Sequence, residues 1–491
     1  MKKLVVVGGG TAGWITALLL KKFYCNYNVT VVASSEIGIL GAGEGTTPHF
    51  LDLAYTLNIN ITELIAKSKA TIKTGIKFTN WNGDEKSYFH PFHIDPLVSL
   101  DSKLRGVYAN ELVEKNNLDE LVFTSKLSED KKVPLDNATG SRYSNIALHF
   151  DARLLAEYLK ELAISRGVVY IDGKINKVNT DDQNFVQSIT LENNISVAVD
   201  FIFDCSGFKR LVLGEVYETE WVSFSESLPM DSAIPFFLPL NGTPAPITEA
   251  IAMKNGWVWK IPTQDRYGCG YVFDSSHCSK EEALKEVSDY FKVDIDATTV
   301  FKFDAGNYKQ VVVNNCMALG LAQGFIEPLE ATSIWTTIEQ LRLFIEQDGL
   351  NNLTECFQKQ FNHSCFSFTD NIRQFIHYHY LTKREDSLFW RNFKSKNTTP
   401  DEVIFKINYI NSNTNLKLPA ENIQSFPSES WLLVGAGTGI FDKEIFSKFL
   451  TGVDKNRVEH IAIEFKKKLI RVSKSCVSHE EVLKEPYNYG L

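Results

Sequence analysis

The sequence predicts an α/β protein with a Rossmann-like core, an intertwined region of mixed sheet and a mainly helical C-terminal part. Three observations lead to this prediction. A GxGxxG motif follows an apolar strand pattern at the N-terminus, glycine-containing turns return near residues 205 and 320, and helical patterns dominate after residue 362. Because these turns come from distant segments, we expect one composite core and not a row of sequential domains.

The N-terminal segment has the pattern of a βαβ unit. Residues 3–7 and 28–32 form short apolar runs, and residues 11–23 place apolar side chains at helical spacing. The glycines between them permit a tight turn and let a pyrophosphate lie close to the backbone at the start of the helix. The predicted dinucleotide-binding residues of this turn are Gly8, Gly10, Thr11, Ala12 and Gly13.

The acidic residue that usually binds the ribose is missing from its expected position. About twenty residues after the motif, where that acid is expected, the chain has Ala33. Glu36, three residues later, is the substitute candidate. A surface loop residue is the alternative interpretation of Glu36.

Further strands and helices follow from the same periodicities. Their predicted bounds are 151–166 and 333–347 for two helices, 168–171, 200–204 and 311–319 for three strands, and 231–273 for a strand-rich stretch.

Composition and charge exclude several classes of protein. The formal net charge of -9 argues against broad nucleic-acid binding. The short basic run 466–468 lies on a predicted helix over 458–472, where it is most simply a solvated face. No apolar run reaches the length of a membrane-spanning helix, so we expect a cytoplasmic protein with no membrane partner.

We expect no metal ion and no disulfide scaffold. The eight cysteines form no CxxC pair and no zinc spacing. His90 and His93 flank Pro91-Phe92, while His377 and His379 diverge on a helical stretch. Neither pair has a third ligand at a convincing spacing.

Two later segments favour FAD over NAD as the dinucleotide. Asp204–Gly207, which includes Ser206, ends a strand with small residues where the backbone must approach a neighbour closely. Gly320–Glu330, which includes Leu321, supplies another glycine-containing turn whose amides can point at a ring system. Each is by itself a tight turn, but together with the N-terminal motif they predict a flavin site.

The sequence also resembles a known family. Residues 257–262 contain WxWxIP, which together with GxGxxG is the signature of flavin-dependent halogenases of the tryptophan-halogenase type. Further segments match that family in the same order: 41–48, 75–81, 149–152, 204–207, 325–330 and 384–391. The resemblance covers residues 1–391 and thins afterwards.

The resemblance implies a fold of the flavin monooxygenase type and two regions. Residues 1–391 would form the FAD-binding halogenase core, with the nucleotide site assembled from segments near 8–48, 204–208 and 320–333. Residues 392–491 would be a helical and loop part that shapes the substrate cavity. The loop over the flavin would include Ala42, Gly43 and Glu44.

The implied reaction uses reduced FAD, O2 and chloride, bromide or iodide to make hypohalous acid. A separate NAD(P)H-flavin reductase would supply the reduced flavin, and the substrate would be a small electron-rich aromatic, indole- or phenol-like. The sequence leaves open whether the protein forms a homo-oligomer. Two other interpretations also remain: a flavin monooxygenase or oxidoreductase, and a flavin-binding protein without halogenase turnover.

The resemblance assigns roles to individual residues. Lys77 would receive the electrophile, and Glu330 would position it or accept the ring proton. A surface lysine and a carboxylate near a helix start are the structural alternatives for these two. Thr332 and Ser333 would hold the halide, although the family usually has Gly where Ser333 stands and Ser where Ala331 stands.

The tryptophans and the C-terminal part bear on what reaches the flavin. Trp257, Trp259, Ile261 and Pro262 would separate the flavin from the substrate, and core packing is the alternative for the two indoles. Tryptophan-acting members carry a Phe-Trp pair in their C-terminal part. Here Phe426 is followed by Pro427, so we expect poor halogenation of free tryptophan.

Overall fold

The computed structural model describes residues 2–38, 43–92, 105–115, 118–297, 299–396, 398–412, 418–419 and 425–490. The chain divides into two compact units, each assembled from three segments. Unit 1 comprises Met1–Lys69, Phe150–Phe224 and Asp304–Asp370, and unit 2 comprises Ala70–His149, Ser225–Phe303 and Asn371–Leu491.

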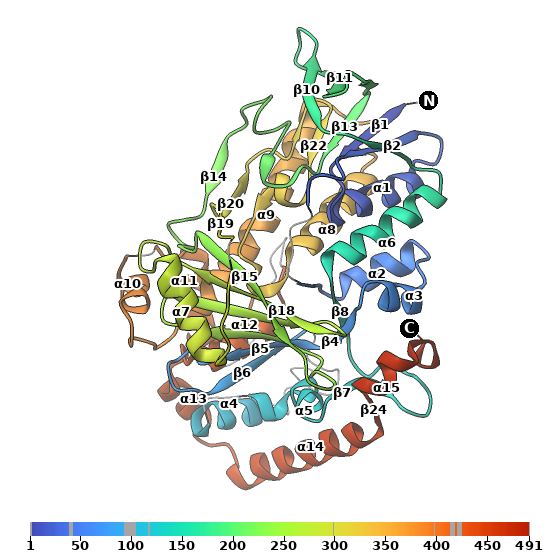
Figure 1. Cartoon of the computed structure of the whole chain (residues 1–491). Helices are drawn as coiled ribbons and strands as arrows, with labels where there is room; N and C mark the ends of the chain where they lie inside the picture. Colours follow the sequence, from blue (N-terminus) through green and yellow to red (C-terminus); the bar gives the residue numbers. More distant parts are fainter. Residues whose placement is uncertain are drawn as a thin grey trace. The chain divides into compact units, whose positions relative to one another are not determined.

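A six-stranded sheet forms the centre of unit 1 (Figure 1), in the order β21-β22-β13-β1-β2-β9. The strand β1 (Lys3–Val7), buried from Leu4 onward, pairs in parallel with β2 (Asn28–Ala33) and β13 (Phe201–Asp204). Its continuous apolar run fits a parallel strand covered on both faces. The remaining strands are β9 (Val169–Asp172), β22 (Cys316–Ala318) and β21 (Val312–Val313).

Most predicted elements of unit 1 are present, with one correction. The helix α1 (Thr11–Phe23) has the predicted bounds, while α6 (Ala152–Ser165) and α8 (Ser333–Glu346) fall within one residue of them. The single strand predicted over 311–319 is wrong. β21 and β22 pair antiparallel instead, because Asn314 between them takes a left-handed backbone with φ 51° and turns the chain.

The smaller elements of unit 1 connect or flank this layer. They are β3 (Glu44–Gly45), α2 (His49–Thr56), α3 (Ile61–Lys67), β10 (Ile175–Thr180), β11 (Val186–Leu191), β12 (Ser196–Ala198), η3 (Gly207–Lys209), β14 (Trp221–Ser223), β20 (Gly306–Tyr308), η4 (Gly320–Ala322), β23 (Gly324–Phe325) and η5 (Pro328–Glu330). The long helix α9 (Glu355–Tyr380) begins in unit 1 and ends in unit 2.

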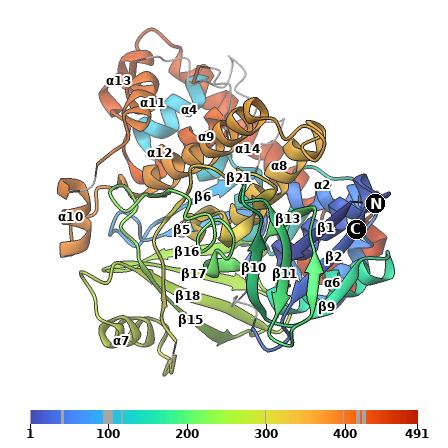
Figure 2. The same ribbon diagram turned by 90° about the horizontal axis from the view of Figure 1, so that it is seen from above.

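Unit 2 contains a seven-stranded sheet in the order β19-β15-β18-β17-β16-β5-β6, which Figure 2 shows from above. Its strands are β19 (Phe301–Lys302), β15 (Ser232–Pro239), β18 (Arg266–Phe273), β17 (Gly256–Pro262), β16 (Thr248–Ala252), β5 (Gly75–Thr79) and β6 (Ser87–Pro91). One face packs a hydrophobic core that includes Ile251, Val258 and Val287, the last from α7 (Lys280–Phe291).

The other elements of unit 2 are mainly helical, as expected for the C-terminal part. They are β4 (Thr71–Lys73), α4 (Arg105–Glu114), η2 (Asp119–Leu121), α5 (Phe123–Glu129), β7 (Lys132–Asp136), β8 (Ala147–Phe150, whose last residue belongs to unit 1), α10 (Leu388–Lys396), α11 (Asp401–Ser412), α12 (Ser428–Thr438), α13 (Lys443–Phe449), α14 (Lys455–Ser475), β24 (Cys476–Ser478), α15 (His479–Lys484) and η6 (Pro486–Tyr489).

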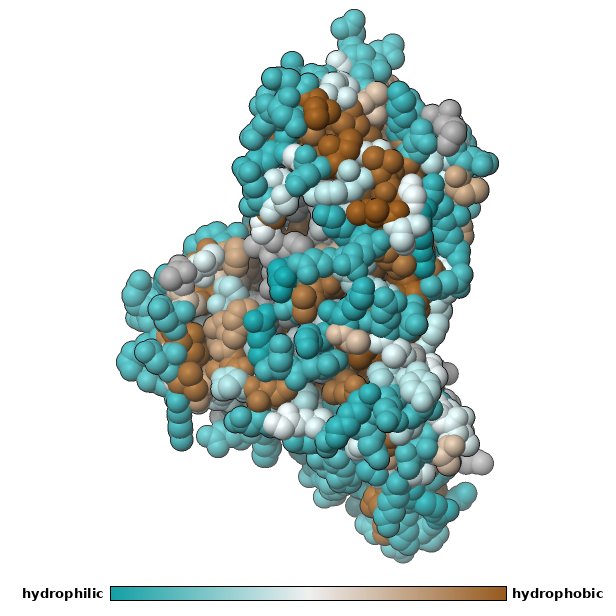
Figure 3. Space-filling model, turned by 45° about the vertical axis from the view of Figure 1, so that its right-hand side comes forward, coloured by the Kyte–Doolittle hydropathy of each residue, from teal (hydrophilic) through white to brown (hydrophobic). Residues whose placement is uncertain are grey.

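Hydrophilic residues cover most of the face drawn in Figure 3, with hydrophobic areas between them. Such a mixture is ordinary for a folded protein. Within the described ranges, no helix combines the length and the apolar character needed to cross a membrane. All eight cysteines are free thiols.

Candidate active site

The GxGxxG turn of unit 1 is built as a cradle between β1 and α1. Gly8 has φ +112°, and a Cβ there would lie 2.2 Å from the Cys205 carbonyl oxygen. A Cβ on Gly13 would lie 2.0 Å from the Gly8 oxygen, so both positions require glycine for the fold itself. A Cβ on Gly10 would meet nothing within 4 Å. Gly10 therefore borders open space.

This open space lies at the start of α1. Gly10 is the N-cap residue, no side chain caps the helix, and the first turn has no acidic residue. The first amide groups of an α-helix have no partner within the helix, and together with the helix dipole they favour an anion. The cradle thus fits the pyrophosphate of a dinucleotide, and Thr11 and Ala12 form its first turn.

Two distant segments lie beside the cradle. The carboxylate of Asp204 accepts hydrogen bonds from the backbone N–H groups of Ser206 (3.0 Å) and Val212 (2.7 Å), which fold the loop after β13. Burial raises the pKa of Asp204, and these bonds oppose that effect. On the other side, Gly320 has φ +61°, and a Cβ there would lie 2.8 Å from the Cβ of Ala12. Leu321 follows in η4.

The substitute ribose acid, Glu36, lies in the turn after β2. Its carboxylate pairs with the ammonium of Lys174 at 2.5 Å, and its side chain is 72% exposed. The position therefore agrees with a loop after the strand, but the carboxylate already has a cationic partner.

The loop predicted to cover the flavin is described only from Gly43 onward, and Ala42 lies outside the described residues. Gly43 has φ +105°, which favours glycine. Burial, followed by the charge of Asp151, raises the pKa of Glu44 to about 7. Glu44 is therefore an ionisable group that titrates near neutrality.

The segment predicted to hold halide forms the start of α8. Ala331 takes a left-handed backbone with φ 54°, and Thr332 is the N-cap residue without a side-chain cap. The buried Thr332 and the exposed Ser333 are followed by a first turn that contains no acidic residue. An uncapped helix start of this kind favours an anion. Glu330, in η5, is 4% exposed.

The predicted tryptophan partition lies on β17 of unit 2. Trp257 is fully buried and Trp259 is partly buried, with ring centroids 6.4 Å apart. The Trp259 ring lies over β18, where a Cβ on Gly270 would be 2.1 Å from it. Ile261 and Pro262 are also buried. Trp257, Trp259 and Ile261 alternate along the strand and share one face of the sheet.

Register places Lys77 on the opposite face from these tryptophans. Through β16, Trp259 is in register with Phe78, and Lys260, the next residue, is in register with Lys77. Glu249 lies between these two lysines, and its carboxylate forms an ion pair with the ammonium of Lys260 at 2.8 Å. Lys77 is only partly buried. Lys77, the predicted electrophile carrier, therefore lies on the face of the sheet away from Trp257 and Trp259.

A second lysine, Lys73 on β4, has different surroundings. Its side chain is 0% exposed, and its ammonium lies 5.0 Å from the centre of the Phe92 ring. The pKa of His149 lies well below its usual range. Burial is the largest cause, and the positive charge of Lys73 is the second. Sequence reasoning missed Lys73. The available signal was a lysine within the otherwise apolar or β-branched run of residues 70–76.

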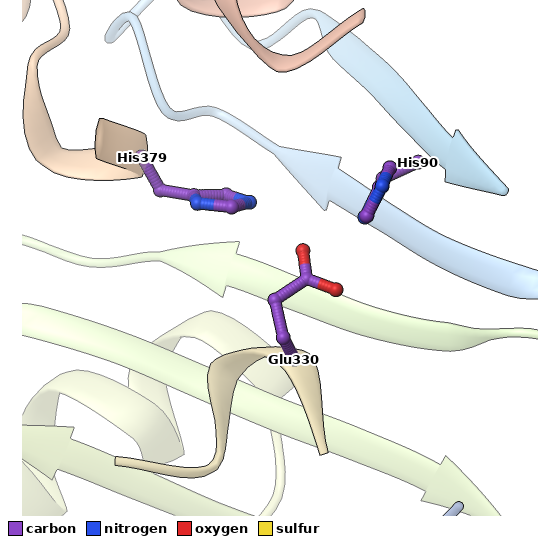
Figure 4. A group of neighbouring side chains, drawn as sticks. All are labelled: His90, Glu330 and His379. Carbon is purple, nitrogen blue, oxygen red and sulfur yellow. The ribbon is translucent and has the colours of Figure 1, made fainter. Parts of the chain in front are cut away.

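Histidines and aromatic rings line the tryptophan-bearing face on β5 and β6. Phe78 stacks on Tyr88 (centroids 4.8 Å apart) and contacts His379 at the same distance. Figure 4 shows His90 and His379, together with Glu330 of unit 1. His90 Nε2 lies 2.9 Å from the Ser430 hydroxyl oxygen, and His379 Nδ1 donates to the Phe375 carbonyl oxygen at 2.8 Å.

The remaining histidines of the predicted pairs have separate surroundings. His377 Nδ1 donates to the Ser227 carbonyl oxygen at 2.8 Å, and burial lowers its pKa to about 4. His93 lies outside the described residues. Phe426, which stands where a Phe-Trp pair would begin, stacks on Phe375 with centroids 3.9 Å apart.

Comparison with known proteins agrees with this arrangement. The tryptophan halogenase family model matches residues 3–451. The chain belongs to the tryptophan halogenase family. Its predicted class, a flavin-dependent halogenase that uses FAD and halide, is thereby confirmed, and so is the α/β fold with a flavin-binding core. Enzymes of this class need a flavin reductase and an aromatic substrate.

Relatives match along most of the halogenase chain. The tryptophan 6-halogenase SttH of Streptomyces toxytricini is 28% identical over 473 residues, 89% of each chain. The 7-chloro-L-tryptophan 6-halogenase KtzR of a Kutzneria species is 30% identical and covers 82% of this chain and 84% of its own. Among solved structures, the flavin-dependent halogenase Xcc4156 of Xanthomonas campestris has a TM-score of 0.89 at 26% identity, with 98% of both chains covered.

Proposed function

We propose that this halogenase attaches halogen to an electron-rich aromatic substrate other than free tryptophan, with separate groups for cofactor, halide and electrophile. The observation that carries the cofactor part is the cradle. Gly8 and Gly13 are fixed by packing, whereas Gly10 borders open space at an uncapped helix start. A ligand with phosphate groups accounts for a glycine that the protein's own packing does not require.

FAD would be held by three segments of unit 1. When bound in reduced form, it supplies together with O2 the two-electron oxidation that turns halide into hypohalous acid. The residues proposed to hold it are Gly8, Gly10, Thr11, Ala12 and Gly13 of the cradle, Ala42, Gly43 and Glu44 of the covering loop, Ser206, and Leu321.

Halide would bind at the start of α8. The backbone amides that follow Thr332 carry partial positive charge and have no partner within the helix. Ser333 adds a hydroxyl donor at this point. The absence of an acidic residue from the first turn removes the repulsion that would weaken halide binding.

The tryptophan-bearing face of unit 2 would keep substrate from the flavin. Trp257, Trp259 and Ile261 place apolar side chains on this face of β17, and Pro262 ends the strand. Large rigid rings exclude both water and substrate from the space that they fill. Oxygen transfer to carbon, the outcome of a monooxygenase, would thereby be prevented.

A lysine would hold the electrophile until it meets the aromatic ring. Lys77 is the prediction from the sequence, but two features favour Lys73. Lys73 is fully buried. Lys77 is half-buried on the face away from the tryptophans, in register with Glu249, which forms an ion pair with Lys260. An amine shielded from water protects hypohalous acid from side reactions, and its N–H groups can donate to the oxygen of that acid.

Glu330 would serve as the proton acceptor. In the halogenation step the halogen of the hypohalous acid forms a bond to a ring carbon, its bond to oxygen breaks, and the lysine ammonium gives a proton to the departing hydroxide. The ring proton then passes to a carboxylate. The nearly complete burial of Glu330 suits a group that must act away from bulk water.

The substrate proposal rests on the C-terminal part. Phe426 has Pro427 as its neighbour, and its ring is stacked on Phe375. We therefore propose that the substrate of this enzyme differs from the tryptophan after which its relatives are named. Indole- or phenol-like molecules without the amino-acid head group are the favoured class.

A turnover screen tests this function. Purified enzyme, FAD, a flavin reductase, NADH and O2 would be combined with chloride, bromide or iodide and with indoles, phenols, anilines and tryptophan. We expect halogenated product from a simple aromatic, more slowly from tryptophan, and none without the reductase. A single product formed faster from tryptophan than from the others would contradict the substrate class. Absence of product with every halide would leave a flavin-binding protein without turnover.

A further inference from the structure

The carboxylate missing at position 33 has a counterpart on the neighbouring strand. β2 and β9 pair in parallel, and their register sets Ala33 directly opposite Asp172. Both residues are the last of their strands. The carboxyl ends of parallel strands form the edge at which α/β sheets bind ligands. Asp172 is far from the GxGxxG motif in sequence, so a spacing rule cannot find it.

The end of β2 lies beside the cofactor cradle. The Gly8 N–H donates to the Val32 carbonyl oxygen at 2.9 Å. A Cβ on Gly9 would lie 2.9 Å from the Cβ of Ala33. The small side chain of Ala33 therefore packs under the cradle itself, and the carboxylate on the adjacent strand, about 5 Å away, is the next group along this edge.

Asp172 is held in place by the turn after β2. Its Oδ1 accepts from the Ser35 N–H at 2.8 Å, and its Oδ2 accepts from the Ser35 hydroxyl at 2.7 Å. These bonds lower the pKa of Asp172, which keeps it ionised. The Ser35 oxygen and the carboxylate retain lone pairs that can accept from the hydroxyls of a sugar.

Glu36, the neighbouring acid, is less suited to this task. One of its oxygens is paired with Lys174 at 2.5 Å, and the side chain is 72% exposed. Asp172 is exposed as well, so exposure does not separate the two acids. The difference is that Glu36 would have to share or release its cation to bind a sugar hydroxyl. Asp172 has no such cation at hydrogen-bond distance within the described residues, and its geometry is fixed by two bonds to one residue.

We propose that Asp172, together with Ser35, binds the adenosine ribose hydroxyls of FAD. This rests on the proposed function and names the group that replaces the missing acid at Ala33. Asp172→Asn would keep the shape of the side chain but remove its charge, and Ser35→Ala would remove the hydroxyl. Glu36→Gln is the matched control on the same turn.

The test compares two flavins, because FMN lacks the adenosine and FAD contains it. Dissociation constants would be measured for both by flavin fluorescence, without turnover. We expect Asp172→Asn to weaken FAD about tenfold and Ser35→Ala less, since a hydrogen bond to a charged group is worth more than one to a neutral group. FMN affinity should be unchanged in both, and Glu36→Gln should leave both flavins at wild-type affinity.

Competition by ADP and 2′-deoxy-ADP refines the test. The wild type should prefer ADP, and Asp172→Asn should not distinguish the two. An Asp172→Asn variant with wild-type FAD affinity would overturn the inference, as would a loss of FAD affinity confined to Glu36→Gln or an equal loss for FAD and FMN. If the wild-type enzyme bound FAD but made no halogenated product, the proposed function would be wrong. The inference that Asp172 binds the ribose would still hold.

Discussion

Unit 1 and unit 2 present their candidate functional groups in different ways. In unit 1 the proposed cofactor and halide sites are built from backbone amides at glycine turns and helix starts, around Gly8, Gly10 and Thr332. In unit 2 the groups are side chains on strands: the rings of Trp257 and Trp259, and two lysines. Backbone sites depend on the path of the chain, whereas side-chain sites depend on which face of a strand is buried.

Within unit 2, burial separates two lysines that are close in the sequence. The strands β4 and β5, which follow each other in the chain but belong to different sheets, carry lysines four residues apart in the sequence. Lys73 is completely buried, and Lys77 is half-buried and in register with Glu249. The family motif pointed to Lys77 alone, but burial decides which amine can keep a reactive halogen species from water.

The largest effect is expected for the cradle of unit 1. Gly8→Ala would put a Cβ 2.2 Å from the Cys205 carbonyl oxygen at φ +112°, so we expect a loss of about 3 kcal/mol or more in the free energy of unfolding. Gly10→Ala meets no protein atom, and should keep that free energy within about 1 kcal/mol while weakening FAD about tenfold or more. Urea unfolding and FAD titration separate the two. A Gly10→Ala variant with wild-type FAD affinity would show that the pyrophosphate does not bind beside Gly10.

An intermediate effect is expected from Glu44 of unit 1, whose pKa is near neutrality. Burial raises its pKa to about 7 from 4.5, so the folded state holds the proton more tightly than the unfolded state. Stability from this group is therefore greatest below pH 4.5 and falls as the pH rises to 7, by at most about 3 kcal/mol.

Urea unfolding of the wild type and of Glu44→Gln at pH 5 and pH 8 checks the sign. The wild type should lose more stability than the variant between these values. Equal losses would show that Glu44 titrates at its ordinary pKa in the folded protein.

A smaller effect is expected for Lys77. Lys77→Met should leave halogenated product within about threefold of the wild type and FAD affinity unchanged, because its side chain lies on the face away from the tryptophans. Product per unit time and FAD titration are the measurements. A fall in product of two orders of magnitude would restore Lys77 as the electrophile carrier.

The smallest effect is expected for the ion pair on that face. Glu249→Gln breaks the 2.8 Å pair with Lys260, whose partners are 31% and 20% exposed, and should cost about 1 kcal/mol or less. Thermal unfolding of Glu249→Gln, Lys260→Met and the double variant gives the coupling between them. Product formation should be unchanged in all three, and its loss would mean that this face takes part in the reaction.

Local patterns were enough to predict the cradle. The strand, glycine turn, helix and second strand lie within residues 3–33, and α1 has the predicted bounds. The match to a known family then supplied the activity and cofactor, since six further motifs follow one another in order. Elements whose residues are neighbours in sequence are fixed by periodicity and turn chemistry alone.

Other features depend on contacts between distant segments and could not be predicted. Asp172 stands opposite Ala33 only because β2 and β9 pair. The faces of Lys77 and Trp259 follow from the register of β5, β16 and β17. The turn at Asn314 was hidden in an apolar run that is equally compatible with one strand. The roles of the individual site residues stay predictions, as does the boundary of the halogenase core at residue 391.

The central claim is that a buried lysine transfers the halogen but plays no part in making the oxidant. Lys73→Met keeps a long apolar side chain in the buried position and removes the amine. In one reaction, a small 1,3-diketone would trap released hypohalous acid while halogenated aromatic product is counted. We predict trapped oxidant near the wild-type level and product lower by about 100-fold. Product near the wild-type level would contradict the claim, and loss of both signals with FAD still bound would move Lys73 to the oxidation step.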